Sequence, residues 1–246
     1  MRALSAAELL NVWERGLAQS PPERALILLA AACPETSSES LATLTVGARD
    51  AQLMTLRKWT FGSQLVCVAS CKGCGELLEL SFAADDLFTN EDGVSSEYFS
   101  FMVDEYELWF RLPNSLDLVE VASCKHVETA RQRLVERCIS KIERRGESIA
   151  ISDVSASVVE ALATRMGEID GSGNVQFALN CPQCAHGGEA IFDIESFFWK
   201  EISAWAARIL REVHQLASAY GWREVDVLNM SAWRRQVYLN LIGANG

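Results

Sequence analysis

Two pairs of cysteines with Cys-x-x-Cys spacing are the residues of this 246-residue chain best suited to chemistry. The segment CKGC supplies Cys71 and Cys74, and the segment CPQC supplies Cys181 and Cys184. Zinc takes four ligands in a tetrahedron, and a two-residue spacer lets one short turn supply two of them. We therefore predict one structural Zn²⁺ site with Cys71, Cys74, Cys181 and Cys184 as its ligands.

Each cysteine pair stands between two runs that are typical of β-strands. QLVCVAS and ELLELSF flank the first pair, and VQFALN and EAIFDI flank the second. The two turns are far apart in the sequence, and closing such a loop costs about 4 kcal/mol of chain entropy. Structural zinc contributes roughly 10–16 kcal/mol in finger peptides, which exceeds that cost. The pattern predicts a split zinc ribbon, with hairpins at residues 61–94 and 174–194 and an inserted α+β subdomain at 95–173.

Several alternatives at these cysteines stay open. The four side chains could be buried thiols without a metal, and iron suits four thiolates as zinc does. Cys67 or His186 could replace one ligand, although Cys67 lies within a strand-like run and His186 follows a complete pair. Ala185 stands where the first turn has Gly75, a residue suited to a positive φ, so we expect the second turn to be looser or longer.

A catalytic zinc site is the alternative that would make the protein an enzyme. His126 and Glu128 precede CPQC as His-x-Glu precedes Cys-x-x-Cys in zinc deaminases. However, Asn180 stands where that signature has proline, and a ligand role for His126 would leave the CKGC pair unused. Four thiolates also leave no open position for a water molecule. We therefore predict no catalytic residues, with a zinc-dependent hydrolase or deaminase as a lesser alternative.

The composition favours a globular protein that binds other proteins. Nearly half of the residues are apolar, which suffices for a buried core. The net charge of −11 opposes the attraction to phosphate that drives non-specific nucleic-acid binding, so a zinc-ribbon nucleic-acid adaptor is a second alternative only. No apolar run approaches the ~20 residues that span a bilayer. We expect a cytoplasmic protein with no membrane contact, in a compartment that keeps thiols reduced and free to bind metal.

Helix signals occupy the first sixty residues, which we predict to be a helical segment (1–60). SAAE at residues 5–8 is a capping box, Ser20 precedes a proline-initiated helix, and apolar residues in 47–59 have helical spacing. In the middle of the chain we expect a hairpin at residues 97–112 and a short helix that starts at Ser115 or Asp117. Two longer helices should follow at Val127–Arg144 and Asp153–Met166, and a turn at residues 170–174.

A C-terminal helical arm, residues 195–246, completes the predicted α+β fold. Apolar residues recur every three or four positions from Glu195 to Tyr220, and Gly221 ends this long helix. Two short helices follow, the second capped by Ser231. Buried aromatic side chains dominate interface energies, so we expect the arm to bind partner proteins. The predicted anchors are Trp205, Trp222, Leu228, Trp233 and Tyr238.

Several segments together resemble baseplate-associated proteins of contractile-tailed phages and related contractile injection systems. They are GARDAQLMTLRKWTFG before a CxxCG hairpin, LWFRLPNSLDL, NCPQC, and the C-terminal run from FFWKEISAW to VYLNLI. The likeness to the T-even-type baseplate hub and hub-assembly family lies mainly in RLPNSLDL and the CPxC segment. The segment YGWREVDVLNMSAWRRQVYL resembles short helical segments that recur in proteins of such tail and injection-system gene clusters.

This resemblance implies a protein without catalytic activity. It would be either a baseplate component or a chaperone that helps hub and wedge subunits assemble. The residues that match the family's metal-binding pattern are the same four cysteines, with Ala185 as a departure from the pattern. Other baseplate subunits, hub or wedge, are the partners it implies, and the finished protein could be incorporated into a phage or tail-like particle.

Overall fold

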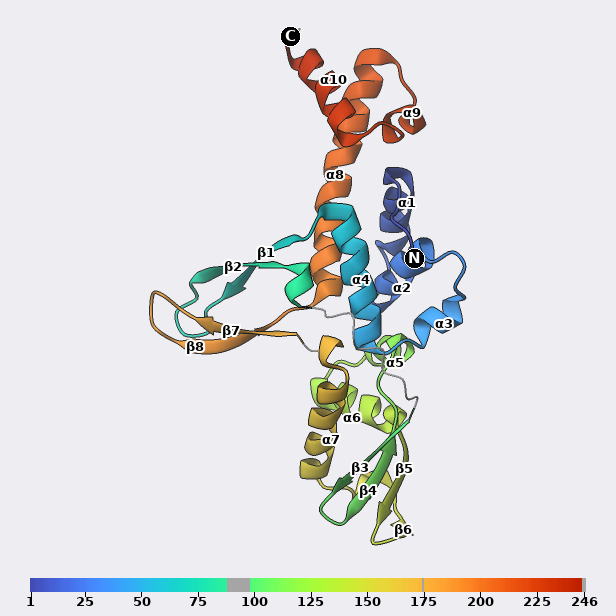
Figure 1. The fold of residues 1–246 in the computed structure, drawn as a ribbon, viewed down its shortest axis with the longest axis vertical. Coiled ribbons are helices and arrows are strands. Elements are labelled where there is room, and N and C mark those ends of the chain that lie inside the picture. The colour runs from blue at the N-terminus through green and yellow to red at the C-terminus, as the bar shows by residue number, and fades with distance from the viewer. Residues whose placement is uncertain (88–97, 174, 245–246) are drawn as a thin grey trace.

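The computed structural model of the protein describes residues 1–87, 98–173 and 175–244. Figure 1 shows an elongated molecule in which a central helical body carries three projections. Two β-hairpins extend to one side, a mixed unit of helices and strands forms one end, and the C-terminal arm forms the other. The predicted α+β class with a long C-terminal helix is confirmed.

The central body consists of four N-terminal helices packed on the first half of a long helix. The helices are α1 (Ala6–Gly16), α2 (Pro21–Ala32), α3 (Ser38–Ala42), α4 (Val46–Phe61) and α8 (Ile194–Tyr220). Both predicted caps are present, because the amides of Ser5 and Ser20 donate to Glu8 and Glu23 over 2.9 and 2.8 Å. The core between the helices is aliphatic and aromatic, with fully buried Leu28, Leu53, Leu56, Phe198 and Ile202.

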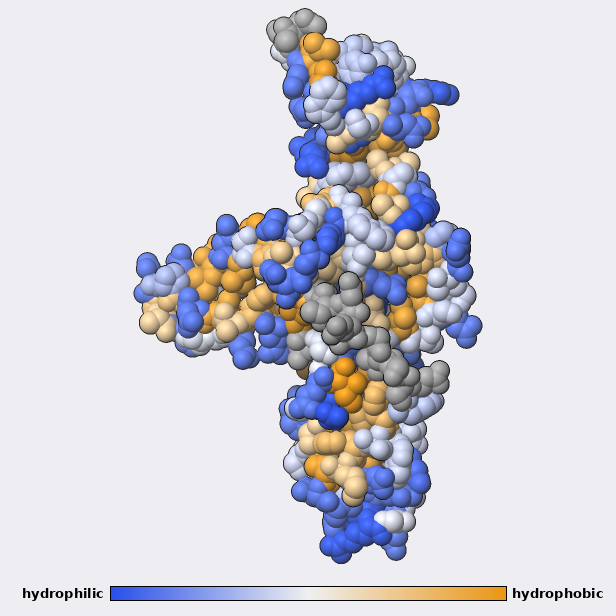
Figure 2. Space-filling view, in the orientation of Figure 1, coloured by the Kyte–Doolittle hydropathy of each residue, from blue (hydrophilic) through white to orange (hydrophobic). Residues whose placement is uncertain are grey.

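The two hairpins are separate two-stranded antiparallel sheets. Strand β1 (Gln64–Ser70) pairs with β2 (Leu77–Ala83), and β7 (Gln176–Asn180) pairs with β8 (Gly187–Ile191). The sheets pack against each other, and the rings of Phe82 and Phe177 lie 4.6 Å apart between centroids. Both hairpins were predicted from the alternating pattern. Their outward faces carry the exposed apolar side chains of Val66, Val68, Leu77 and Ile191. Figure 2 shows apolar surface along this projection.

The inserted unit is a four-stranded antiparallel sheet with helices on it. The strand order is β3 (Phe99–Val103), β4 (Tyr106–Phe110), β5 (Ile139–Arg144) and β6 (Glu147–Ser148). The helices are α5 (Ser115–Val121), α6 (Val127–Cys138) and α7 (Ala156–Ile169), with 3-10 turns η2 (Ile151–Asp153) and η3 (Gly171–Gly173). Buried Leu108, Phe110, Ile142, Val158 and Leu162 form its core.

The structure corrects parts of the prediction for this unit. The helix predicted over Val127–Arg144 ends at Cys138, because Ile139–Arg144 pairs with β4 as a strand. The next helix begins at Ala156, since Ile151–Asp153 forms a 3-10 turn. The short helix α5 begins at Ser115, as predicted, and Asn114 caps it. Residue 97, residue 174 and the predicted boundary between residues 94 and 95 lie outside the described residues.

The arm consists of the second half of α8, α9 (Glu224–Leu228) and α10 (Ala232–Ala244). Gly221 ends α8 with a φ of +68°, and Ser231 Oγ accepts the amide of Arg234 at the start of α10 over 3.2 Å, as predicted. A third apolar cluster joins α8, α9 and α10 to the start of α1. Within the described ranges, no helix has both the length and the apolar character needed to cross a bilayer.

Candidate metal centre

The four predicted cysteines meet at one point between the two hairpin turns. Their sulfur atoms all lie within 4.8 Å of one another. The closest pairs run from one turn to the other, with 3.7 Å between Cys71 Sγ and Cys184 Sγ and 3.6 Å between Cys74 Sγ and Cys181 Sγ. A tetrahedron with zinc–sulfur bonds of about 2.3 Å has edges of about 3.8 Å. The four sulfur atoms therefore fit a tetrahedral metal ion.

The two turns have the same backbone geometry. In the first, the amide of Gly75 donates to Cys71 O over 2.9 Å, and in the second the amide of Ala185 donates to Cys181 O over 2.9 Å. Gly75 has a φ of +79° and Ala185 a φ of +56°. The expectation of a looser second turn is wrong, because its hydrogen bonds hold Ala185 in the left-handed region. That conformation costs a residue with a side chain about 1–2 kcal/mol.

Backbone amides of the turns point at the sulfur atoms and prepare them for ionisation. The amides of Cys74 and Gly73 lower the pKa of Cys71 to about 6, and the Gly73 nitrogen lies 3.3 Å from its sulfur. The amide of Glu76 lowers the pKa of Cys74, but the nearby sulfurs of Cys184 and Cys181 outweigh it and raise that pKa to about 12. Four thiolates this close repel one another, so their full ionisation requires a cation among them.

The other metal-binding candidates lie outside this cluster. Among the described residues, the four cysteines are the one group of histidine, cysteine and acidic side chains with ligand atoms close enough to share an ion. His186 contacts the cluster from outside, since its backbone amide donates to the Cys184 sulfur. Cys67 is half-buried on β1, and His126 stands before the first residue of α6. Neither belongs to the cluster.

The predicted partner anchors lie in two kinds of environment. Leu228 is buried in the arm's own cluster, and Trp205 is half-buried beside it. Trp222 stacks on Tyr220 at 4.5 Å between ring centroids, and Tyr238 lies edge-on to Trp222 at 4.8 Å. Trp233 is 78% exposed on α10. Much of the predicted anchor set thus stabilises the arm itself, whereas Trp233 faces solvent.

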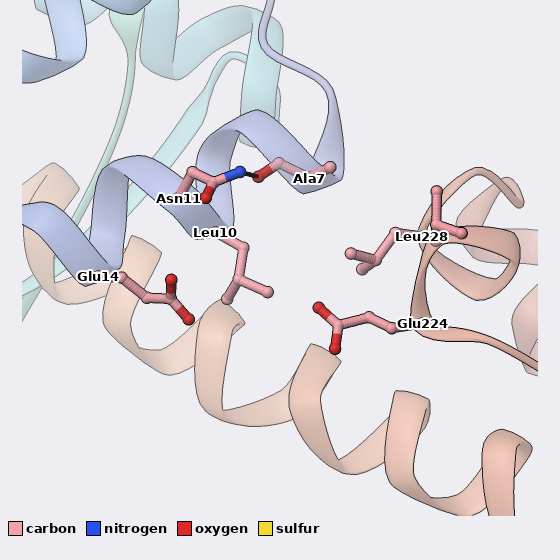
Figure 3. Close-up of a pocket in the computed structure, with 7 residues that line it drawn as sticks. Ala7, Leu10, Asn11, Glu14, Glu224 and Leu228 are labelled. Atoms are coloured by element: carbon pink, nitrogen blue, oxygen red, sulfur yellow. Dashed lines mark hydrogen bonds between the residues drawn. The ribbon is translucent and has the colours of Figure 1, made fainter.

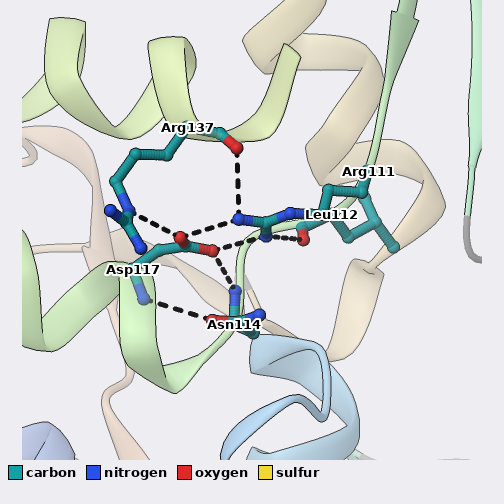
Figure 4. A network of polar contacts seen from close by, with 5 residues as sticks. All are labelled: Arg111, Leu112, Asn114, Asp117 and Arg137. Carbon is teal, nitrogen blue, oxygen red and sulfur yellow. Dashed lines mark hydrogen bonds and ion pairs between the residues drawn. The ribbon is translucent and has the colours of Figure 1, made fainter. Parts of the chain in front are cut away.

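A buried ion-pair network underlies the RLPNSLDL segment, and the sequence analysis did not single it out. Figure 4 shows the fully buried carboxylate of Asp117 between Arg111, Arg137 and Asn114. Two nitrogens of Arg111 donate to it over 2.5 and 2.8 Å, and Arg137 Nε donates over 2.8 Å. Burial raises the pKa of Asp117, but the donors from Arg111 and the Asn114 amide outweigh burial and lower it. The network fixes the turn between β4, α5 and α6.

Comparison with known proteins gives one family match. A family model described as T4 bacteriophage base plate protein matches residues 14–199, about three quarters of the chain. The matched segment contains both hairpins, all four clustered cysteines and the Asp117 network, and it ends in the second turn of α8. No curated protein and no solved structure matches the chain.

Proposed function

Because the chain belongs to the T4 bacteriophage base plate protein family, we propose that it is a non-catalytic, zinc-stabilised scaffold that joins or assembles hub or wedge subunits. The closed set of four cysteine sulfurs within 4.8 Å of one another carries this proposal. A closed tetrahedral site stabilises a fold and leaves no position for a reacting water. A four-thiolate zinc ion is therefore a structural element of the protein.

The place of the cluster in the fold supports a bracing role. Cys71 and Cys74 precede β2, whereas Cys181 and Cys184 precede β8, so one ion would join two hairpins that share no backbone pairing. Cys71 and Cys181 are buried and the other two sulfurs lie on exposed residues near the hairpin tips. When bound, the ion would supply cross-linking energy, and this chain's residues would hold the two turns in register around it.

The shape of the molecule supports a connecting role. The hairpins, the inserted unit and the arm extend from one body in three directions, which separates three candidate docking surfaces (Figure 1). The predicted arm anchors Trp205, Trp222, Leu228, Trp233 and Tyr238 remain part of the proposal. Assembly in the cytoplasm, followed by incorporation into the phage particle, is the course that fits a base plate subunit.

Co-purification with defined subunits tests this function. The tagged full chain is produced together with the hub and wedge subunits of the same phage, and the captured proteins are identified by mass spectrometry. We expect a hub or wedge subunit to co-purify in fixed stoichiometry. Failure to capture any of them would reject the scaffold role. Finding the chain in purified particles would identify a component, and finding it in pre-assembly complexes alone would identify a chaperone.

A further inference from the structure

Three apolar side chains form a stripe on the outer face of α10. Trp233, Val237 and Leu241 are 78%, 37% and 49% exposed. They are spaced by four residues, so they share one face of the helix. The opposite face carries Tyr238, Leu239 and Ile242, which pack against the arm's cluster. No other described element covers this surface, which we call the α10 stripe.

One surface arginine, Arg234, lies beside the α10 stripe of this acidic protein. Residues 229–246 contain two arginines and no acidic residue, although the whole chain has a net charge of −11. Arg235 is buried and pairs with Glu212 at 3.0 Å. Arg234 adjoins Trp233 on the surface, where its guanidinium lies 5.8 Å from the ring centroid of Tyr238. Among the described residues, no carboxylate forms an ion pair with Arg234, so its charge is available to a partner.

A groove of complementary character lies between α1 and α9. It encloses about 310 Å³ and is lined by Ala7, Leu10, Asn11, Glu14, Glu224, Val225 and Leu228. Figure 3 shows Leu10 and Leu228 reaching toward each other from the two helices, with the carboxylates of Glu14 and Glu224 beside them. Neither carboxylate has an ion-pair partner among the described residues. The groove therefore has an apolar floor and an anionic rim.

We propose that the α10 stripe of one copy docks into the α1/α9 groove of a second copy. Trp233 would cover the apolar floor, and Arg234 would face Glu14 and Glu224, since tryptophan and arginine are the side chains that most often anchor interfaces. In Figure 1, α10 and α9 flank the end of α8 on opposite sides, so a stripe cannot reach the groove of its own chain. Pairing of two stripes would instead bring two Arg234 side chains together without an acidic residue of α10 between them.

The contact joins two different surfaces. Two copies therefore either exchange stripes reciprocally in a closed two-fold dimer, or leave one stripe and one groove free and propagate into a ring or an open chain. With the exception of Glu14, both surfaces lie outside the family-matched residues 14–199. Self-association through these two surfaces extends the proposed function. The inference rests on the arm's proposed role in docking.

Mixing two single-surface variants tests the contact. Trp233→Glu removes the stripe, and the double variant Glu14→Arg/Glu224→Arg reverses the rim of the groove. All three positions are exposed, so both variants should fold, as checked by circular dichroism and metal content. Sedimentation velocity of the wild-type chain should give a mass that rises above 27.2 kDa with concentration. Each variant alone should weaken association at least tenfold.

The equimolar mixture of the two variants distinguishes the possible contacts. One intact stripe then meets one intact groove, so a dimer should form and grow no further. A groove variant that still associates as wild type does would indicate stripe-to-stripe pairing and overturn the assignment. Absence of a dimer in the mixture would also overturn it. A wild-type chain that stays monomeric would also overturn it. If that monomer still captured hub or wedge subunits, the proposed function would stand and a foreign subunit would occupy this face.

Discussion

The carboxylate of Asp170, directly after α7, accepts the amide of Gly47 in the first turn of α4 over 2.8 Å, across 123 positions of sequence. The hydroxyl of Thr45 donates to the same carboxylate over 3.3 Å, and the amide of Val46 donates to Pro113 O over 3.1 Å. The first amides of a helix lack partners within the helix. The inserted unit supplies partners for those of α4, and this contact fixes it to the central body.

Replacement of Gly47 by alanine should weaken this junction. A Cβ at Gly47 would overlap the Asp170 carboxylate and approach Gly173 N to 2.9 Å. Alanine improves an exposed helix position by about 1 kcal/mol over glycine, but here we expect a net loss of about 1–3 kcal/mol from overpacking. Urea unfolding measures the difference. Gly243→Ala on α10, where a Cβ meets nothing within 4 Å, is the matched control and should not destabilise the protein.

Loss of any one sulfur of the cluster should remove the metal. We expect native protein to contain about one zinc ion per chain by elemental analysis, and the Cys71→Ser and Cys181→Ser variants each to contain almost none. Both pairs would contribute to one ion, since their sulfurs alternate around the site at 3.6–3.7 Å. Cys67→Ser, which changes a half-buried cysteine outside the cluster, should keep its metal. Metal loss in only one of the two ligand variants would mean that the pairs act separately.

A single substitution in the second hairpin turn should stabilise the protein. Ala185 has a φ of +56°, a conformation that glycine adopts without steric cost. Ala185→Gly should therefore raise the free energy of unfolding by about 0.5–1 kcal/mol, after the greater chain entropy of glycine is deducted. Gly75→Ala, at a φ of +79° in the first turn, should lower it by about 1–2 kcal/mol. A fall in the free energy of unfolding in both variants would contradict the strain assigned to Ala185.

Local signals in the sequence predicted the helix caps and the hairpins, because each depends on residues a few positions apart. The cysteine cluster joins two such local turns across 107 and 113 positions, and its prediction followed from the four ligands that zinc requires. The error at Ile139 has a non-local cause. Ile139 and Ile142 continue the helical spacing of α6, but their pairing with Phe110 and Leu108 of β4 makes the segment a strand. Burial of charged groups is equally hidden from the sequence, since Asp117 is enclosed by Arg111 of the loop after β4, Asn114 at the cap of α5 and Arg137 of α6.

The Asp117 network should be among the most sensitive sites of the inserted unit. Asp117→Asn removes the negative charge between Arg111 and Arg137, and breaking a buried pair on one side costs about 3–5 kcal/mol. Because the exposure of both arginines lets water compensate, we expect about 2–3 kcal/mol. Glu160→Gln, which removes a surface partner of Arg131, should have a much smaller effect, because water screens an exposed pair. Urea unfolding followed by tryptophan fluorescence compares the two variants.

A second buried charge cluster joins α4 to the start of α8. Arg49 Nη2 lies 2.8 Å from Asp50 Oδ1 and 3.3 Å from Glu195 Oε2, and all three residues are buried. Burial raises the pKa of Glu195 to about 7, because Arg49 offsets the loss of hydration only in part and Asp193 adds repulsion. The same causes, with burial first, raise the pKa of Asp50 to about 6. One arginine is thus shared by two carboxyl groups that resist ionisation.

Glu195→Gln should flatten the dependence of stability on pH. The folded pKa of Glu195 lies above its ordinary value of 4.5, so the folded state binds the proton more tightly than the unfolded state. Its contribution is fully present below pH 4.5 and is lost as pH rises to about 7, by up to about 3 kcal/mol at roughly 1.4 kcal/mol per pKa unit. Glutamine cannot ionise, so this part of the decrease disappears, while Asp50 keeps its own part. Urea unfolding of both proteins at pH 5, 6, 7 and 8 gives the difference between their free energies of unfolding at each pH. Effects that both proteins share, such as metal release, cancel in this difference. The variant should gain stability relative to wild type as pH rises, and parallel curves would show that Glu195 is ionised throughout this range.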